Sequence, residues 1–139
     1  MSAQRHGFSL LELLCALAVV AVLAACAVPT HRAASIRARR TDARIALLGL
    51  ASLQERHYFQ HGRYAASLAE LGVTAARSSE GFYRLGVRAA ASGQGFIAEA
   101  MPLPGGPQAE DRDCAVLRVD ERGRRSASGS ADADRRCWT

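Results

Sequence analysis

The chain has 139 residues and a formal net charge of +5, and its 18 basic residues, all of them arginine, outnumber 13 acidic residues. This length suits one small domain, and the mixed composition excludes both a disordered tail and a protein with many membrane spans. The arginine content permits binding to acidic surfaces without demonstrating it.

The chain begins with a short polar stretch, 1–7, of the kind that precedes a membrane-inserting segment as a cytoplasmic leader. From Phe8 to Val28 it is apolar except for Ser9 and Glu12. Since an α-helix rises about 1.5 Å per residue, a helix of this length crosses a bilayer. We therefore expect one N-terminal membrane segment followed by a domain of ordinary soluble polarity.

A second helical half is expected over 29–61, after a kink at Pro29, because proline removes one helix hydrogen bond and disfavours helical geometry at the preceding residue. Alanine, arginine and leucine, which are good helix formers, dominate this stretch. At 3.6 residues per turn its apolar side chains fall on two opposite faces. One face holds Ile36, Ala43, Leu47, Leu50 and Tyr58, and the other holds Ile45, Leu48 and Phe59. Two apolar faces predict two contacts, one with the rest of the soluble domain and one with neighbouring subunits. A helix that is buried on both sides would show the same pattern.

The remaining segment, 62–139, predicts a loop followed by a small sheet. The loop runs from Tyr64 to Gly72, includes one helical turn, and turns Leu68 and Leu71 inward. Alternating apolar residues, or an apolar-rich run, predict strands, and turn residues separate the last two. The expected strands are 82–87, 95–101, 115–119 and 124–126. An antiparallel meander packed on the helix gives an α+β fold, and 127–134 is expected to be a surface loop.

The four cysteines fall into two pairs. Cys15 and Cys26 lie within the apolar run, whereas Cys114 and Cys137 flank a polar stretch near the end. We expect a disulfide in the second pair, which would stabilise the fold by about 3 kcal/mol. Such a bond requires an oxidising compartment such as the periplasm.

The stretch Gly7-Phe8-Ser9-Leu10-Leu11-Glu12-Leu13 resembles the processing and assembly signature of type IV pilins and of the related pseudopilins of type II secretion. The resemblance implies that a membrane peptidase cuts between Gly7 and Phe8 and methylates the new amine of Phe8. It also implies that Glu12 pairs with the amine of a neighbouring subunit and sets the stagger in the filament. A carboxylate in a membrane helix is costly unless it is paired, which gives Glu12 a physical reason to be there.

Further along, the resemblance is to the minor pilins. It covers the segment that leaves the long helix, where Tyr58, Phe59 and Tyr64 are expected to close the seam between helix and loop. The disulfide near the end is also similar to that of minor pilins.

This resemblance implies the type IV pilin fold, a long kinked helix packed on about four antiparallel strands, and a structural subunit with no cofactor and no enzymatic activity. It implies insertion in the bacterial inner membrane with a periplasmic C-terminal domain, and then assembly into an extracellular pilus. The implied partners are other pilins through their N-terminal helices, the prepilin peptidase and the assembly platform.

Two other interpretations stay open. A type II secretion pseudopilin shares the same signature. Leu23-Ala24-Ala25-Cys26 also matches the consensus at which bacterial lipoproteins are cut and lipidated. Arginines follow the apolar run in greater number than they precede it, so the positive-inside rule alone favours the opposite orientation. The leader is still expected in the cytoplasm, because the processing implied by the resemblance and the disulfide both require that orientation.

Candidate ligand sites are weak. His57 and His61 lie four residues apart and offer two metal ligands without a third, so no metal site is expected. The acidic cluster of Glu110, Asp111 and Asp113 lacks the alternation of a calcium loop and is expected to be an exposed loop. DNA is a further partner that the arginines allow and that no pattern indicates, because they are scattered among acidic residues.

Overall fold

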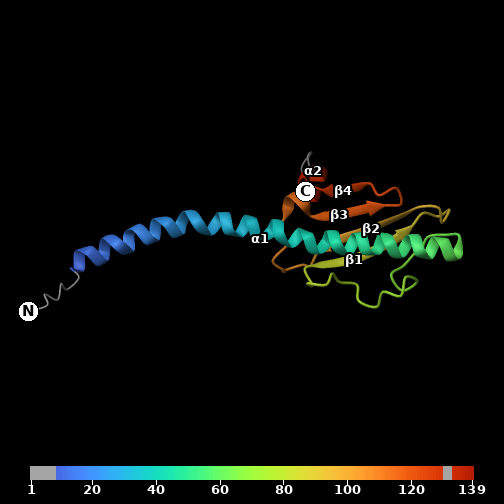
Figure 1. The fold of residues 1–139 in the computed structure, drawn as a ribbon, viewed down its shortest axis with the longest axis horizontal. Coiled ribbons are helices and arrows are strands. Elements are labelled where there is room, and N and C mark those ends of the chain that lie inside the picture. The colour runs from blue at the N-terminus through green and yellow to red at the C-terminus, as the bar shows by residue number, and fades with distance from the viewer. Residues whose placement is uncertain (1–8, 130–132) are drawn as a thin grey trace, which may run out of the picture. The chain divides into compact units, whose positions relative to one another are not determined.

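The computed structural model describes residues 9–129 and 133–139 (Figure 1). Their elements follow the order helix, two strands, a short 3-10 helix, two strands and a second helix. Their bounds are α1 (Leu10–His61), β1 (Tyr83–Ala89), β2 (Phe96–Pro102), η1 (Arg112–Cys114), β3 (Val116–Asp120), β4 (Arg125–Ser128) and α2 (Ala133–Trp138). The chain divides into two units, 1–35 and 36–139, and the second unit is called the head below.

Helix α1 continues through Pro29 and ends at His61, where the sequence predicted the end of the second helical half. The predicted kink at Pro29 stays a prediction. Gly62 follows at φ +69°, a left-handed conformation that glycine adopts without steric cost and that commonly ends helices. Its amide donates to the carbonyl of Tyr58 at 2.8 Å, so the last turn is closed by a backbone hydrogen bond.

The sheet is an antiparallel meander in the order β1-β2-β3-β4, as the sequence predicted. The four strands begin and end within two residues of their predicted bounds. Asp120 fixes the β3–β4 turn, since its Oδ1 accepts hydrogen bonds from the amides of Arg122 and Arg124 at 3.0 and 2.9 Å. Gly123 takes the left-handed conformation that this tight turn requires.

The core lies between the head part of α1 and one face of the sheet (Figure 1). Leu47 and Leu50 supply the helix side, and Tyr83 and Leu117 are fully or almost fully buried on the sheet side. Ala98 and Ala100 of the central strand β2 are fully buried too, and these small side chains leave room for the helix. The strand alternation is therefore confirmed, and of the two predicted apolar faces of the helix the one with Leu47 and Leu50 packs on the sheet.

The loop after α1 is held by an amide clasp. Gln54 donates through Nε2 to the carbonyl of Ala65 at 2.9 Å and accepts from the amide of Ala65 at 2.8 Å. Tyr64 packs against Tyr58 with ring centroids 4.6 Å apart, so these two aromatics close the seam between helix and loop as predicted. The prediction was wrong for Phe59, which is 93% exposed, because its position on the helix faces away from the loop.

The C-terminal segment differs from the predicted surface loop. Strand β4 extends to Ser128, and α2 begins at Ala133. Cys137 within α2 is bonded to Cys114, and the indole Nε1 of Trp138 donates to the carbonyl of Ser126 at 3.0 Å. The disulfide was predicted, whereas the helix that carries Cys137 and the hydrogen bond of Trp138 were not.

Candidate functional site

The apolar part of α1 presents its side chains to the surroundings. Leu10, Leu11 and Leu23 are 64 to 77% exposed, and Glu12 lies in the first helical turn. Within the described residues, α1 is the one helix that is long and apolar enough to cross a membrane by length and composition. The predicted cleavage and methylation residues, Gly7 and Phe8, lie outside the described residues.

The face of α1 opposite the sheet carries three exposed apolar side chains, which we call the outer stripe. They are Ile45, Leu48 and Phe59, exposed by 63, 46 and 93%. Leu47, on the inward face of the same helix, is fully buried. Of the two apolar faces of the helix, one therefore packs in the head, and the other is not covered by any other part of the described chain.

Arg40 and Asp111 form a buried ion pair between α1 and the segment before η1. The guanidinium donates through Nε and Nη2 to the two carboxylate oxygens at 2.7 and 2.8 Å. This hydrogen bonding raises the pKa of Arg40 despite the opposing effect of burial. Beside the pair, Gln108 donates to Asp111 and to the hydroxyl of buried Tyr83. The acidic cluster is therefore not uniformly exposed as predicted, because Asp111 is the buried partner of a helix arginine.

Two further arginines of α1 are also used by the head. Arg44 donates through Nε to the carbonyl of Cys137 at 3.1 Å, and burial lowers the pKa of Arg44. The guanidinium of Arg39 lies 5.2 Å from the ring centre of Phe82, a cation–π contact. Arg39, Arg40 and Arg44, which follow the apolar run, thus make contacts within the head. Their positions therefore have a structural explanation that does not involve the positive-inside rule.

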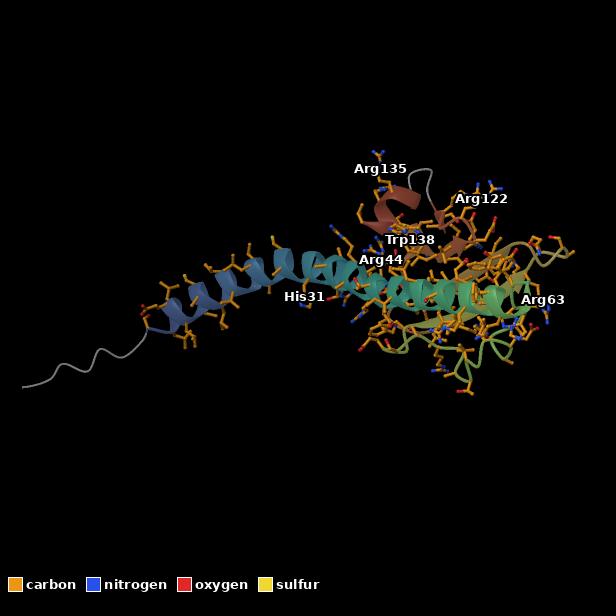
Figure 2. The ribbon with its side chains drawn as sticks, turned by 45° about the vertical axis from the view of Figure 1, so that its right-hand side comes forward. His31, Arg44, Arg63, Arg122, Arg135 and Trp138 are labelled. Atoms are coloured by element: carbon orange, nitrogen blue, oxygen red, sulfur yellow. A yellow bond between two sulfur atoms is a disulfide. The ribbon has the colours of Figure 1, made fainter. Side chains whose placement is uncertain are left out.

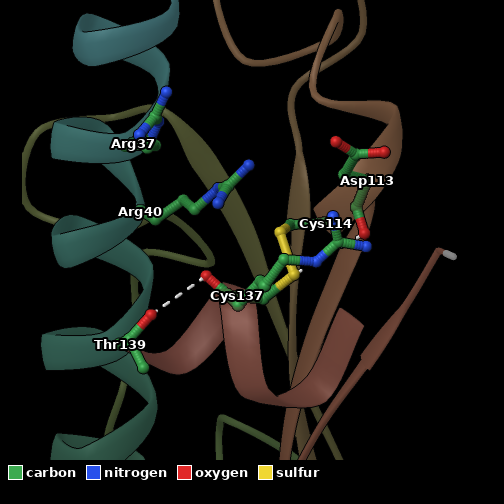
Figure 3. A pocket seen from close by; sticks show the side chains of 7 residues that line it. Arg37, Arg40, Asp113, Cys114, Cys137 and Thr139 are labelled. Atoms are coloured by element: carbon green, nitrogen blue, oxygen red, sulfur yellow. Dashed lines mark hydrogen bonds between the residues drawn. A yellow bond between two sulfur atoms is a disulfide. The ribbon is translucent and has the colours of Figure 1, made fainter. Parts of the chain in front are cut away.

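A pocket of about 400 Å³ lies beside this anchor (Figure 3). Its walls are Arg37 and Arg40 from α1, the Cys114–Cys137 disulfide, Asp113, and the end of α2 with Arg136 and Thr139. The disulfide joins the two cysteines expected to pair, and their Cα atoms lie 5.7 Å apart. Cys15 and Cys26 are free and exposed.

His57 and His61 do not form a metal site. Their rings stack 4.1 Å apart at 19°, so the lone pairs of the ring nitrogens, which lie in the ring planes, run side by side and do not converge on one ion. His61 Nδ1 is also 3.0 Å from the carbonyl of His57. Among the described residues there is no group of three or more metal-ligating side chains.

Two family models match the chain. One is described as "Type IV minor pilin ComP, DNA uptake sequence receptor" and matches residues 29–118, more than half of the chain. The other is the prokaryotic N-terminal methylation motif, which matches residues 2–27.

Curated relatives and a solved structure agree with these models. The chain is 30% identical over 60% of its length to a fimbrial protein of Neisseria meningitidis serogroup A, and 31% identical over 60% to the type IV major pilin protein PilE of Neisseria gonorrhoeae. These matches span about half the length of each relative. A type IV pilin structure from Shewanella oneidensis matches 75% of the chain and 98% of that protein, with a TM-score of 0.55 and 29% identity. The family models, the curated relatives and the solved pilin structure thus agree, and the chain belongs to the family of the type IV minor pilin ComP.

Proposed function

We propose that the chain is a minor structural subunit of a type IV pilus. In this proposal 8–28 anchors the subunit in the inner membrane with the head in the periplasm. The prepilin peptidase cuts between Gly7 and Phe8, the amine of Phe8 is methylated, and the assembly platform inserts the subunit into the filament. The observation that carries the proposal is the methylation motif over 2–27, directly followed by the minor pilin match over 29–118.

Glu12 is proposed to set the register between subunits. An unpaired carboxylate among leucines is costly in an apolar filament core, and the methylated amine of a neighbouring Phe8 supplies the opposite charge. The charge-free Glu12→Gln variant should be processed normally but enter filaments poorly, whereas Glu12→Asp should retain part of the incorporation.

The outer stripe is proposed as a second contact with neighbouring pilins. It lies on the same helix as the exposed apolar segment, and exposed apolar side chains at helical spacing are typical of a face covered in an assembly.

A pilus role is favoured over a type II secretion role because the matched relatives are fimbrial proteins and pilins. Deleting the gene and scoring piliation, motility and secretion separately tests the choice. Loss of piliation with intact secretion is expected, and loss of secretion alone would contradict the proposal.

DNA binding is a second candidate function, which the description of the matched family favours. The β3–β4 turn offers arginines for phosphate contacts: Arg122 and Arg124 have side chains 73 and 71% exposed, and Arg122 extends outward from the head (Figure 2). Part of this charge is already paired, since Arg124 Nε lies 2.7 Å from Asp120 Oδ2 and Arg122 Nε lies 3.6 Å from Glu121 Oε1.

The test is fluorescence anisotropy of a labelled DNA duplex with the full chain in detergent, over a series of salt concentrations. If the chain binds DNA, affinity should fall steeply with salt, and each lost phosphate contact should reduce the log–log slope by about 0.9. Arg122→Gln should therefore show a shallower slope than the wild type. Binding that ignores salt, or no binding at low salt, would remove this function while leaving the pilus role intact.

A further inference from the structure

The face of the sheet turned away from α1 carries exposed arginines along the edge strand β1. Tyr83 and Leu85 are buried in the core, so Arg84, which lies between them, is on the opposite face and is exposed. Arg88 is also exposed and lies four positions further on the same face, about 13 Å along the strand. The loop before β1 adds exposed Arg77, which pairs with Arg84 in an isolated antiparallel bridge and therefore shares its face. We call Arg77, Arg84 and Arg88 the arginine edge.

The bridge places two like charges opposite each other. Beside the pair, the amide of Leu85 donates to the carbonyl of Ala76 at 3.0 Å, and a second backbone bond of 2.9 Å lies on the other side. Arg77 and Arg84 are therefore a non-hydrogen-bonded pair, the kind in which opposite side chains are closest. Like charges in this position are destabilising. Neither guanidinium has a hydrogen bond or an ion pair with any residue that the structure describes, so both keep their donors for a ligand.

Glu99 of β2 neutralises a different part of this face. Its Oε2 lies 3.5 Å from Nη2 of Arg88 and 3.4 Å from Nε of Arg118, which stands opposite it on β3. Gly86 stands opposite Glu99 on β1, and a Cβ there would lie 3.4 Å from Cγ of Glu99, so the glycine leaves room for this side chain. Glu99 thus competes for Arg88 and makes no ion pair with the other two members of the arginine edge.

The composition of this face suits a phosphate backbone. Apart from charged residues, the outward positions of the four strands hold glycine, serine, isoleucine, valine and methionine. Single-stranded nucleic acids gain affinity by stacking bases on aromatic rings, and these positions provide none. Arginine forks match phosphate oxygens, and over a length of about 13 Å a duplex carries about eight phosphate charges. The face therefore favours a duplex over a single strand.

We propose that the arginine edge contacts the phosphates of duplex DNA and that Glu99 limits this contact by holding Arg88. The inference rests on the DNA-binding function proposed above and assigns phosphate contacts to residues outside the β3–β4 turn. Phosphate contacts carry no sequence information, so this face should add the same affinity to duplexes of any sequence.

The test is anisotropy of two labelled duplexes of unrelated sequence with the full chain in detergent, over a series of salt concentrations. Arg77→Gln with Arg84→Gln removes two phosphate contacts, so the log–log slope should become shallower by about 1.8, which is about 0.9 per contact. The dissociation constant at low salt should rise at least tenfold, by the same factor for both duplexes. The unfolding midpoint of this variant should not fall, because the substitutions remove a like-charge pair.

The matched control is Arg56→Gln with Arg135→Gln, which removes the same charge from exposed arginines of α1 and α2. Its affinity for the duplex should fall less than threefold. Equal losses in the two double variants would overturn the arginine edge, because net charge alone would then explain them. An unlabelled single strand that competes as well as the duplex would overturn the duplex as the ligand.

The variant Glu99→Gln tests the competition for Arg88. Removing the carboxylate charge should tighten duplex binding at least threefold, a gain that misfolding does not produce. Glu110→Gln, an exposed carboxylate in the loop between β2 and β3, is the control with the same charge change and should bind as the wild type. Unchanged affinity in Glu99→Gln would overturn the role given to Glu99.

The outcomes separate this inference from the proposed functions. A wild type that binds duplex DNA, with an unchanged slope in Arg77→Gln with Arg84→Gln, would remove the arginine edge alone. A wild type that binds no DNA at low salt would remove the DNA-binding function together with this inference. Both results leave the pilus role intact, because processing and assembly test it separately.

Discussion

The buried pair of Arg40 and Asp111 should be important for the stability of the head. Asp111→Ala leaves the buried Arg40 guanidinium without its carboxylate, and breaking a buried pair in this way costs about 3 to 5 kcal/mol. The measurement is urea unfolding of the full chain in detergent, followed by Trp138 fluorescence. The double variant Arg40→Met with Asp111→Leu should lose much less, because no unpaired charge remains; equal losses in both variants would contradict this account.

Tyr64 should make the head sensitive to alkali. Burial, together with a 3.0 Å hydrogen bond to Glu55, raises the pKa of Tyr64 to about 12. The folded chain then keeps a proton that the unfolded chain releases near pH 10, so the free energy of unfolding should fall as pH rises from about 10 to about 12. In Tyr64→Phe this fall should be shallower when unfolding is measured across the same range. An identical slope in both proteins would exclude Tyr64 as the cause.

At the scale of residues, the sequence predicted the burial of side chains that follow a local pattern. It missed the burial of side chains whose partner is distant in the sequence. The inward leucines of α1 follow from helical spacing alone. Asp111 was missed because its partner lies 71 positions away, and an acidic run before a strand looks the same whether its residues are solvated or paired. A polar residue, Gln108, that is fully buried in the same loop was missed for the same reason.

At the scale of elements, the disulfide should hold α2 against the sheet. The Cys114→Ser, Cys137→Ser double variant should lose about 3 kcal/mol, the entropic value for a loop of this length, because the cysteines are 23 positions apart. Thermal or urea unfolding measures the loss. The matched control is Cys15→Ser with Cys26→Ser, whose side chains lie outside the head and whose loss should leave its unfolding unchanged.

The outer stripe should matter for assembly and not for folding. Ile45→Glu with Leu48→Glu places charges on side chains that are already exposed, so the free energy of unfolding should change by about 0.5 kcal/mol or less per site. Incorporation into pili, scored by immunoblot of sheared filaments, should fall severely. Normal incorporation would contradict a contact at this face, whereas loss of folding would show that the helix is buried on both sides.

The strands and the long helix were predictable because their apolar residues recur every 2 residues in a strand and every 3.6 residues in a helix. Helix α2 was not predictable, because its six residues are too few to show a helical period that would distinguish them from a loop. Its stability comes from Cys137 and Trp138, whose contacts arise only when the sheet has formed.

At the scale of the whole molecule, the pattern of apolar residues along the chain predicted an apolar segment, a helix and a meander sheet in that order, and comparison with a solved pilin confirms the pilin fold. The choice between pilus and secretion machine was not evident, because both use the same N-terminal chemistry.

Processing is the step that the account depends on most directly, and intact mass spectrometry of the chain expressed with the prepilin peptidase measures it. The account predicts a mature chain that starts at methylated Phe8 and lacks 1–7. A chain that starts at lipidated Cys26, or that keeps its first seven residues in the presence of active peptidase, would contradict it.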